Sequence, residues 1–324
     1  MTAAVLSLAF ARGYAVTMRP YLLFVSGVTG LLGMALGPAA PVLTTLALAL
    51  AFFASYGFGQ ALTDCFQTDT DALSAPYRPL VQGRLRRRDV LLVSLLGLAG
   101  CGLVLARHAP ANVPLAGLAV AGLATYTPFK RRWWAGPFYN AWIVALLVLL
   151  GYAAVTGASR QPSAPHPALP PALAVAFFGY ANFVLTGYFK DRTADRATGY
   201  RTLPVVFGFG PSAVASDVLA TLQLVACGLA ARAALADASP AWHDIPGLAL
   251  LGVGVAAAIL GQVRLHRVRH EDQAYHAIVP VVHTYVLLGA GLTALLVPAW
   301  GPALGLVYGA FVIALRRRPL RRQI

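Results

Sequence analysis

Residues 42–71 read VLTTLALALAFFASYGFGQALTDCFQTDTD, a long apolar run that ends in an acidic segment. Roughly twenty apolar residues are enough for a helix to cross the hydrocarbon core of a bilayer. Asp64, Asp69 and Asp71 therefore stand where a membrane helix would reach the membrane edge. Carboxylates in such places are costly and usually have a function. The stretch predicts a membrane protein with an anionic site at the membrane boundary.

A second apolar run, residues 171–189, ends in the same way, in KDRTAD at residues 190–195. The two acidic segments hold five of the 11 acidic residues of the chain. Mg²⁺ prefers hard oxygen ligands, and it needs only one or two carboxylates when phosphate oxygens and waters supply the rest. Two carboxylate clusters at one membrane boundary therefore predict a site for Mg²⁺ carrying a diphosphate.

Helical periodicity groups these side chains further. Residues at i, i+3, i+4 and i+7 share one face of a helix. Asp64, Gln67 and Asp71 have this spacing, and Asp191 lies four positions before Asp195. If each helix continues through its acidic segment, each presents two carboxylates to the site. The four aspartates are therefore the predicted metal ligands.

The composition indicates that most of the chain lies in lipid. Apolar residues make up 58% and charged residues 11%, with a mean hydropathy of +0.68, whereas soluble domains carry about 25% charged residues. We expect an all-α protein, a polytopic membrane bundle of nine to ten transmembrane helices around a central cavity, formed by residues 1–324 as a single domain. The candidate spans are residues 20–37, 42–62, 89–106, 111–127, 136–156, 171–189, 211–235, 245–263, 276–296 and the shorter 301–315.

The distribution of positive charge predicts the topology. With a cytoplasmic N-terminus and ten spans, 22 of the 25 lysines and arginines fall in cytoplasmic segments and only Arg107, Arg160 and Arg232 fall on the opposite face. This bias is the positive-inside pattern, and it places both acidic segments on the cytoplasmic side. It also explains the net charge of +14 without nucleic acid, which we do not expect as a partner, because the charge is spread over six loops.

Lysine is rare in this chain, which has 23 arginines but only Lys130 and Lys190. Lys130 follows Tyr126 by four residues at the end of a predicted span, and Lys190 adjoins Asp191. A compact ammonium suits a phosphate oxygen or a leaving diphosphate. The alternative is that both lysines are interfacial anchors that extend toward the headgroups.

Four motifs together resemble a known family, the UbiA-type intramembrane prenyltransferases. Residues 71–80 (DALSAPYRPL) resemble the end of the first aspartate-rich region, and residues 126–130 (YTPFK) are similar to the YxxxK motif. Residues 191–208, from DRTAD to TLPVVFG, resemble the second, DxxxD, motif with its TLPV-G tail, and Arg19-Pro20 is usual before the first span. The residues of these motifs are most similar to those of the branch that contains chlorophyll synthase and the homogentisate transferases.

The resemblance implies a function and roles for residues. Family members hold Mg²⁺ and an isoprenyl diphosphate on the two aspartate motifs and place the prenyl chain in an apolar cavity. The diphosphate then leaves, and a lipophilic, often aromatic, acceptor attacks the allylic cation. The residues expected to be catalytic or to bind metal are Asp64, Asp71, Asp191 and Asp195, with Lys130 as a catalytic cation. Those expected to bind substrate are Gln67, Arg78, Tyr126, Lys190 and Asn182, although Asn182, like Asn140, could instead bond between helices.

The first motif departs from the family pattern NDxxDxxxD. The corresponding residues are Thr63, Asp64, Gln67 and Asp71, so the asparagine and the middle aspartate are replaced. Gln67 is neutral and a poor Mg²⁺ ligand. This departure leaves three alternatives: two Mg²⁺ ions still bind through the four aspartates, one of the ions binds more weakly, or the substrate differs.

Two other functions remain open at this stage. A terpene cyclase on the same scaffold would ionise the same diphosphate and let an internal alkene attack the cation. A non-catalytic binder or carrier of an amphipathic lipid is favoured only by the replaced residues of the first motif. The arginine- and alanine-rich composition is typical of high-GC bacteria, so we expect an integral protein of a bacterial cell membrane with its active-site loops in the cytoplasm.

Overall fold

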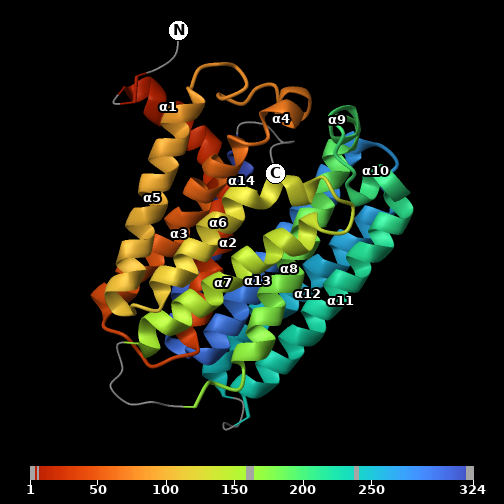
Figure 1. Cartoon of the computed structure of the whole chain (residues 1–324). Coiled ribbons are helices and arrows are strands. Elements are labelled where there is room, and N and C mark those ends of the chain that lie inside the picture. The colour runs from red at the N-terminus through yellow and green to blue at the C-terminus, as the bar shows by residue number, and fades with distance from the viewer. Residues whose placement is uncertain (1–3, 6, 158–163, 237–240, 319–324) are drawn as a thin grey trace.

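The computed structural model describes residues 4–5, 7–157, 164–236 and 241–318, and every regular element in these ranges is a helix. The prediction of an all-α protein is therefore confirmed. The long helices pack into a single bundle (Figure 1). They are α2 (Leu23–Ala35), α3 (Val42–Asp64), α5 (Arg87–His108), α6 (Asn112–Lys130), α7 (Gly136–Thr156), α8 (Leu169–Gly187), α11 (Phe209–Ala234), α12 (Ile245–His266), α13 (Tyr275–Leu296) and α14 (Gly301–Arg316).

Eight helices of the described chain are long and apolar enough to cross a membrane, and nine are if the bent pair formed by α1 (Leu8–Met18) and residues 20–35 counts as one span. The chain is thus an integral membrane protein. Helix α6, which begins one residue after the start of the expected span 111–127, is not among these eight or nine. The ten-span topology therefore stays a prediction.

A break at Arg19 separates α1 from the short 3₁₀ helix Pro20–Leu22 and α2, with a bend of 41°. Arg19 has a positive φ of 52°. The residue before a proline is disfavoured in the α region, and Pro20 offers no backbone N–H. The dipeptide Arg19-Pro20 therefore ends α1, and it leaves the Arg19 side chain inside the bundle, only 9% exposed.

Helix α13 lies at the centre of the bundle and contacts α2, α8, α11 and α12. Helices α2 and α7 approach closely through glycines. A Cβ added to Gly33 would lie 2.1 Å from the Val148 carbonyl oxygen, and one added to Gly151 would lie 2.3 Å from that of Gly30. Such small residues let membrane helices approach to backbone contact.

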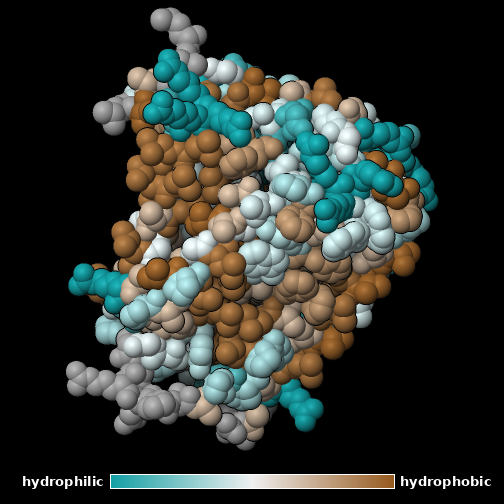
Figure 2. Space-filling model, in the orientation of Figure 1, coloured by the Kyte–Doolittle hydropathy of each residue, from teal (hydrophilic) through white to brown (hydrophobic). Residues whose placement is uncertain are grey.

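Short elements gather at one end of the bundle (Figure 1). They are α4 (Thr68–Ser74), the 3₁₀ turn Tyr188–Asp191, α9 (Arg192–Ala197) and α10 (Leu203–Phe207). Three further 3₁₀ turns are Trp242–Asp244, Glu271–Gln273 and Pro298–Trp300. Figure 2 shows hydrophilic surface over the end that carries α4, α9 and α10, with a broad hydrophobic surface below it. Both acidic segments therefore lie at the same polar end of the molecule.

Candidate active site

The first acidic segment is bent rather than continuously helical. Helix α3 ends at Asp64, Gln67 is the N-cap residue of α4, and Asp71 lies in the first turn of α4. The expectation that one helix carries all three is therefore wrong. The turn between the helices nevertheless brings these three side chains to the wall of one polar cavity.

Two arginines pair with the carboxylates of the first segment. Arg19 Nη2 donates to both Asp64 carboxylate oxygens at 3.0 Å. Arg78 Nη1 lies 3.6 Å from Asp64 Oδ1 and forms a closer ion pair with Asp71. Burial raises the pKa of Asp71, while Arg78 acts in the opposite direction. The paired arginine thus favours the ionised form of Asp71 in a site that water reaches poorly.

The second acidic segment is also divided. Asp191 ends a 3₁₀ turn and lines the polar cavity, whereas Asp195 lies within α9 and is fully buried. Thr202 donates to Asp195 Oδ2 at 3.2 Å. Asp195 Oδ1 lies 3.3 Å from Lys130 Nζ but takes part in no hydrogen bond of acceptable geometry. Lys130 is therefore the cation that this buried oxygen contacts.

Lys130 connects the two acidic segments. Its Nζ donates to Gln67 Oε1 at 3.3 Å, and it faces Asp195 at the same distance. The ammonium also lies over the rings of Tyr188 and Tyr200, 5.5 and 5.0 Å from their centroids. One turn earlier, the Tyr126 hydroxyl lies 2.5 Å from that of Tyr188. Lys130 is thus held in place by one partner from the turn after α3 and three from residues 188–200.

The polar cavity has about 700 Å³ of empty space. It brings together most of the residues that the sequence analysis selected: Asp64, Gln67, Asp71, Arg78, Tyr126, Lys130, Lys190 and Asp191. Asp195 lies behind Lys130 and is not part of the lining. Eight of the ten predicted site residues therefore face one cavity.

Asn182 lies elsewhere. Its side-chain oxygen accepts a hydrogen bond of 2.5 Å from Ser216 on α11, and Ser216 also lies 3.0 Å from the Gln262 side-chain oxygen on α12. Asn182 is 3% exposed and is not among the lining residues of the polar cavity. The structure thus places it as a bridge between helices, the alternative reading of this buried amide.

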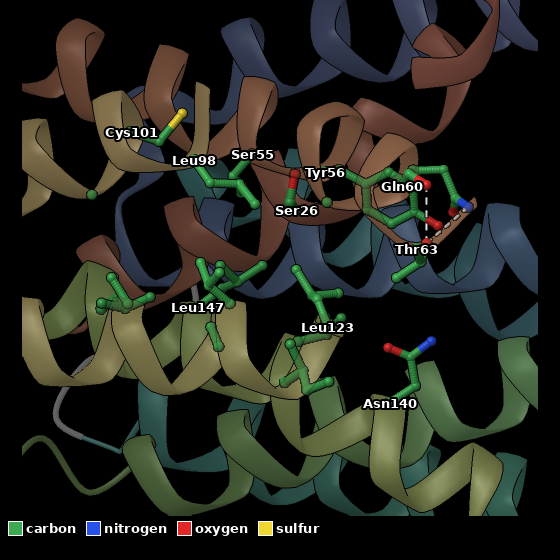
Figure 3. Close-up of a pocket in the computed structure, with 18 of the residues that line it drawn as sticks. Ser26, Ser55, Tyr56, Gln60, Thr63, Leu98, Cys101, Leu123, Asn140 and Leu147 are labelled. Carbon is green, nitrogen blue, oxygen red and sulfur yellow. Dashed lines mark hydrogen bonds between the residues drawn. The ribbon is translucent and has the colours of Figure 1, made fainter. Parts of the chain in front are cut away.

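A second, apolar cavity adjoins the first, with about 790 Å³ of empty space. Helices α3, α5, α6 and α7 supply most of its wall, including Leu98, Leu123 and Leu147 (Figure 3). Five residues line both cavities, and we call them the junction: Tyr56, Gln60, Thr63, Asn140 and Tyr180.

Several residues of the site were not selected from the sequence. Arg19 was noted only as part of a motif. Its positive charge, at the membrane boundary expected to carry the aspartates, could have identified it as a site residue. Gln60 lies one turn before Asp64 and donates to its Oδ1 at 2.7 Å. Glu271 accepts a hydrogen bond from the Thr193 backbone N–H at 2.7 Å. The sequence around Glu271 does not indicate this contact, because the two residues lie 78 positions apart.

The arrangement of the carboxylates suits a Mg²⁺ ion that is held partly by substrate, and not one that is enclosed by protein side chains alone. Within the described ranges, no group of three or more His, Cys, Asp or Glu side chains is placed to hold a metal ion alone. Mg²⁺ usually takes one or two carboxylates and completes its shell with waters and substrate phosphates. Asp64, Asp71 and Asp191, which line the polar cavity, match that mode of binding.

Together, these features define an integral membrane protein in which a polar cavity lined by carboxylates and cations adjoins an apolar cavity. Residues 23–279 match the UbiA prenyltransferase family, and the chain belongs to this family. It is therefore a prenyltransferase, as the resemblance of the motifs predicted.

A digeranylgeranylglyceryl phosphate synthase of Thermococcus sibiricus is 26% identical over 232 residues, which cover 67% of this chain and 76% of that protein. The chloroplastic chlorophyll synthase of Arabidopsis thaliana is 28% identical over 165 residues, 47% of this chain and 41% of that protein.

Solved structures show the same fold. A UbiA homologue from Aeropyrum pernix K1 aligns with a TM-score of 0.66 at 18% identity, covering 84% of this chain and 96% of that one. A UbiA homologue from Archaeoglobus fulgidus bound to DMAPP and Mg²⁺ aligns with a TM-score of 0.62 at 17% identity, covering 87% and 99%. The predicted bundle around a central site is thus the fold of known structures.

Proposed function

We propose that this protein transfers an isoprenyl group from its diphosphate to a lipophilic acceptor in a Mg²⁺-dependent reaction. The observation that carries the proposal is the junction, where a polar cavity lined by carboxylates and cations meets an apolar cavity. An isoprenyl diphosphate has the same division between a charged head and an apolar chain. Homologous structures with bound DMAPP or GPP and Mg²⁺ support the assignment.

In this proposal Asp64, Asp71, Asp191 and Asp195 hold Mg²⁺ with the diphosphate. Bound Mg²⁺ would neutralise the charge that develops on the leaving diphosphate. Asp191 reaches the cavity directly, whereas Asp195 reaches it only if Lys130 shifts, because the two are in contact. Asp64 and Asp71 reach it from the opposite segment.

The cations of the cavity bind the diphosphate oxygens. Lys130, Lys190 and Arg78 all line it, and charge-assisted hydrogen bonds from such groups are roughly twice as strong as neutral ones. Gln67 and Tyr126 lie beside Lys130, and they hold it or the diphosphate in place. Tight packing around the buried Lys130 limits the access of water to the site. Water would otherwise react with the allylic cation that forms when the diphosphate leaves.

The prenyl chain occupies the apolar cavity, and the acceptor approaches the junction. The aromatic acceptor predicted from the motifs rests on the resemblance alone. Relatives named digeranylgeranylglyceryl phosphate synthases support the wider class of lipophilic acceptors. A terpene cyclase or a lipid carrier would use the same two cavities, so the assay must separate them.

The chain acts as a single domain in the membrane, with its site at the cytoplasmic face of a bacterial cell membrane. The 22-to-3 division of lysine and arginine supports this orientation. Reporter fusions after Arg160 and after Ile324 are expected on opposite sides of the membrane. Finding both on one side would refute the ten-span topology.

The function is tested with purified protein in nanodiscs, geranylgeranyl diphosphate and Mg²⁺, with and without a lipophilic acceptor. Released diphosphate and prenylated product are measured together. Diphosphate release that requires Mg²⁺, with product only when acceptor is present, is the expected result. A cyclic hydrocarbon formed without acceptor would identify a cyclase, and binding without release of diphosphate would identify a carrier.

A further inference from the structure

Tyr188 is a buried phenol of the polar cavity that was not selected from the sequence. It directly follows α8, three residues before Asp191, and it lines the cavity while only 4% exposed. Two of its contacts are with α6. Its hydroxyl lies 2.5 Å from that of Tyr126, and its ring centroid lies 5.5 Å from Lys130 Nζ. One side chain therefore contacts both Tyr126 and Lys130.

These two contacts fix the orientation of the Tyr188 ring. Tyr126 and Lys130 are four positions apart, so they share one face of α6. The short hydrogen bond between the two phenols holds the far end of the Tyr188 side chain, and the face of the ring stays turned toward the ammonium. A cation over an aromatic face is attracted by the ring quadrupole, and the attraction is stronger where water is excluded. Lys130 is 5% exposed and meets this condition.

Gly136, at the start of α7, makes room for this arrangement. A Cβ added at this position would overlap the Tyr188 hydroxyl oxygen and would lie 3.2 Å from the Lys130 Cα. A larger residue would therefore displace the end of the Tyr188 side chain. The absence of a side chain at residue 136 allows the phenol to lie against α6.

A second tyrosine, Tyr200, also lies beside the ammonium but outside the cavity. Its ring centroid is 5.0 Å from Lys130 Nζ. In the described part of the chain, the residues that line the polar cavity include neither Tyr200 nor Asp195, the carboxylate partner of the lysine. Gln67 and Tyr188 are the partners of Lys130 that do line it. Tyr188 is thus the aromatic partner on the side where a diphosphate would bind.

From these contacts we propose that Tyr188 is a positioning residue for Lys130 and keeps its ammonium directed into the polar cavity. The inference rests on the proposed prenyl transfer and goes beyond it. When Lys130 moves toward a diphosphate oxygen, its contact with Asp195 lengthens. The ring face lets the ammonium make this movement without losing every partner. Placement matters for the rate, because an error of about 1 Å can slow a reaction by about 100-fold.

Two substitutions of Tyr188 test the role of its ring. Tyr188→Leu removes the ring and the hydroxyl, whereas Tyr188→Phe removes the hydroxyl alone. With geranylgeranyl diphosphate, Mg²⁺ and saturating acceptor, Tyr188→Leu should slow diphosphate release about tenfold or more, and Tyr188→Phe about three- to fivefold. The KM for the acceptor should not change. A Tyr188→Leu variant with the wild-type rate overturns the inference.

Tyr139→Phe is the matched control. The Tyr139 hydroxyl lies 2.6 Å from that of Thr125 on α6, and neither residue is among those that line the polar cavity. The substitution therefore removes a phenol hydrogen bond to the same helix, away from Lys130. Release of diphosphate should continue at the wild-type rate.

A double variant distinguishes positioning from a merely structural role. If Tyr188 acts through Lys130, Tyr188→Leu should slow release by less than about twofold when Lys130 is already Met, because residues that share one interaction are not additive. Effects that multiply in the double variant overturn the inference. The Kd of a non-hydrolysable geranylgeranyl bisphosphonate with Mg²⁺ is measured for the same four proteins, and the same lack of additivity is expected.

Gly136→Ala is a second test, which does not depend on the folding of Tyr188→Leu. The added methyl group should displace the Tyr188 hydroxyl and slow release about tenfold. In the double variant Gly136→Ala/Tyr188→Phe the displaced oxygen is absent, so the rate should return to that of Tyr188→Phe. A double variant as slow as Gly136→Ala overturns the inference.

The wild-type protein separates this inference from the proposed function. If it releases no diphosphate, the proposed function fails, and the Kd values of the bisphosphonate alone decide the inference. If it releases diphosphate but Tyr188 and Lys130 contribute independently, the inference fails and the proposed function stands. Neither release of diphosphate nor binding of the bisphosphonate by the wild type overturns both.

Discussion

Lys130 and Asp195 form a buried ion pair that joins α6 to α9, with Nζ 3.3 Å from Oδ1. The lysine is 5% exposed and the aspartate is fully buried. Both belong to motifs that the sequence places in different segments, and their contact links the basic and acidic parts of the site. Burial of such a pair is costly unless the geometry is well satisfied, so its presence at the polar cavity indicates a functional role.

Replacing Lys130 with Met should slow diphosphate release by about 100-fold or more, since removal of one donor that stabilises developing charge commonly costs this much. The apparent KM for the acceptor should change little. Single-turnover release of diphosphate at saturating acceptor measures the effect, and Lys130→Arg, which keeps the charge, should retain more activity than Lys130→Met. A change confined to the acceptor KM would count against a contact with the diphosphate.

Asp191→Ala and Asp195→Ala should both abolish Mg²⁺-dependent activity but should differ in stability. Asp195→Ala leaves Lys130 buried without its partner, at a cost of roughly 3–5 kcal/mol, so its melting temperature should fall. Asp191 forms none of the ion pairs identified within the described ranges, and its loss should leave the melting temperature close to wild type.

Asp69→Asn is the matched control for these two variants. Asp69 lies in the first acidic segment but pairs with Arg131 at 3.1 Å on the exposed surface, outside the polar cavity. Its replacement should keep activity within about twofold, because exposed ion pairs contribute little. Near-normal turnover of Asp191→Ala at low Mg²⁺ would show that the site is assigned to the wrong residues.

The fold was predictable because its main signals are local. Apolar length identifies spans, and the acidic segments identify their polar ends, so Asp64 and Asp191 could be selected directly. The bend between Asp64 and Asp71 was not predictable from periodicity, because the register of a helix says nothing about where it stops. The position of Asn182 away from the polar cavity was not predictable for a different reason. Its hydrogen bond with Ser216 depends on how α8 and α11 pack.

Glu271 is predicted to position the second acidic segment. Its carboxylate accepts hydrogen bonds from the Thr193 backbone N–H and hydroxyl, two residues after Asp191. Glu271→Ala should raise the Mg²⁺ concentration for half-maximal activity about three- to tenfold, since a typical hydrogen bond has a net contribution of roughly 0.5–1.5 kcal/mol. Mg²⁺ titrations of diphosphate release provide the measurement.

Glu271→Gln is the control, because it keeps an oxygen that accepts these bonds while it removes the charge. It should shift the Mg²⁺ dependence less than Glu271→Ala does. A variant that melts at a lower temperature yet keeps the wild-type Mg²⁺ dependence would restrict Glu271 to a structural role.

The last prediction concerns Gln67, where the chain departs from the family pattern. Its Oε1 accepts a hydrogen bond from Lys130 Nζ at 3.3 Å, and its side chain lines the cavity with Asp64 and Asp71. A carboxylate at this position would add one negative charge beside the lysine and supply a better ligand for Mg²⁺. Gln67→Asp should therefore lower the Mg²⁺ concentration needed for half-maximal diphosphate release.

Gln67→Glu separates charge from length, because it has the length of glutamine and the charge of aspartate. If charge decides, both variants should shift the Mg²⁺ dependence in the same direction, and a Gln67→Leu variant should not. Each carboxylate also strengthens the hold on Lys130, so the rate of diphosphate departure should fall if the lysine must move toward the leaving group. An unchanged rate and an unchanged Mg²⁺ dependence in both acidic variants would place residue 67 outside the reach of the ion, despite its position at the cavity wall.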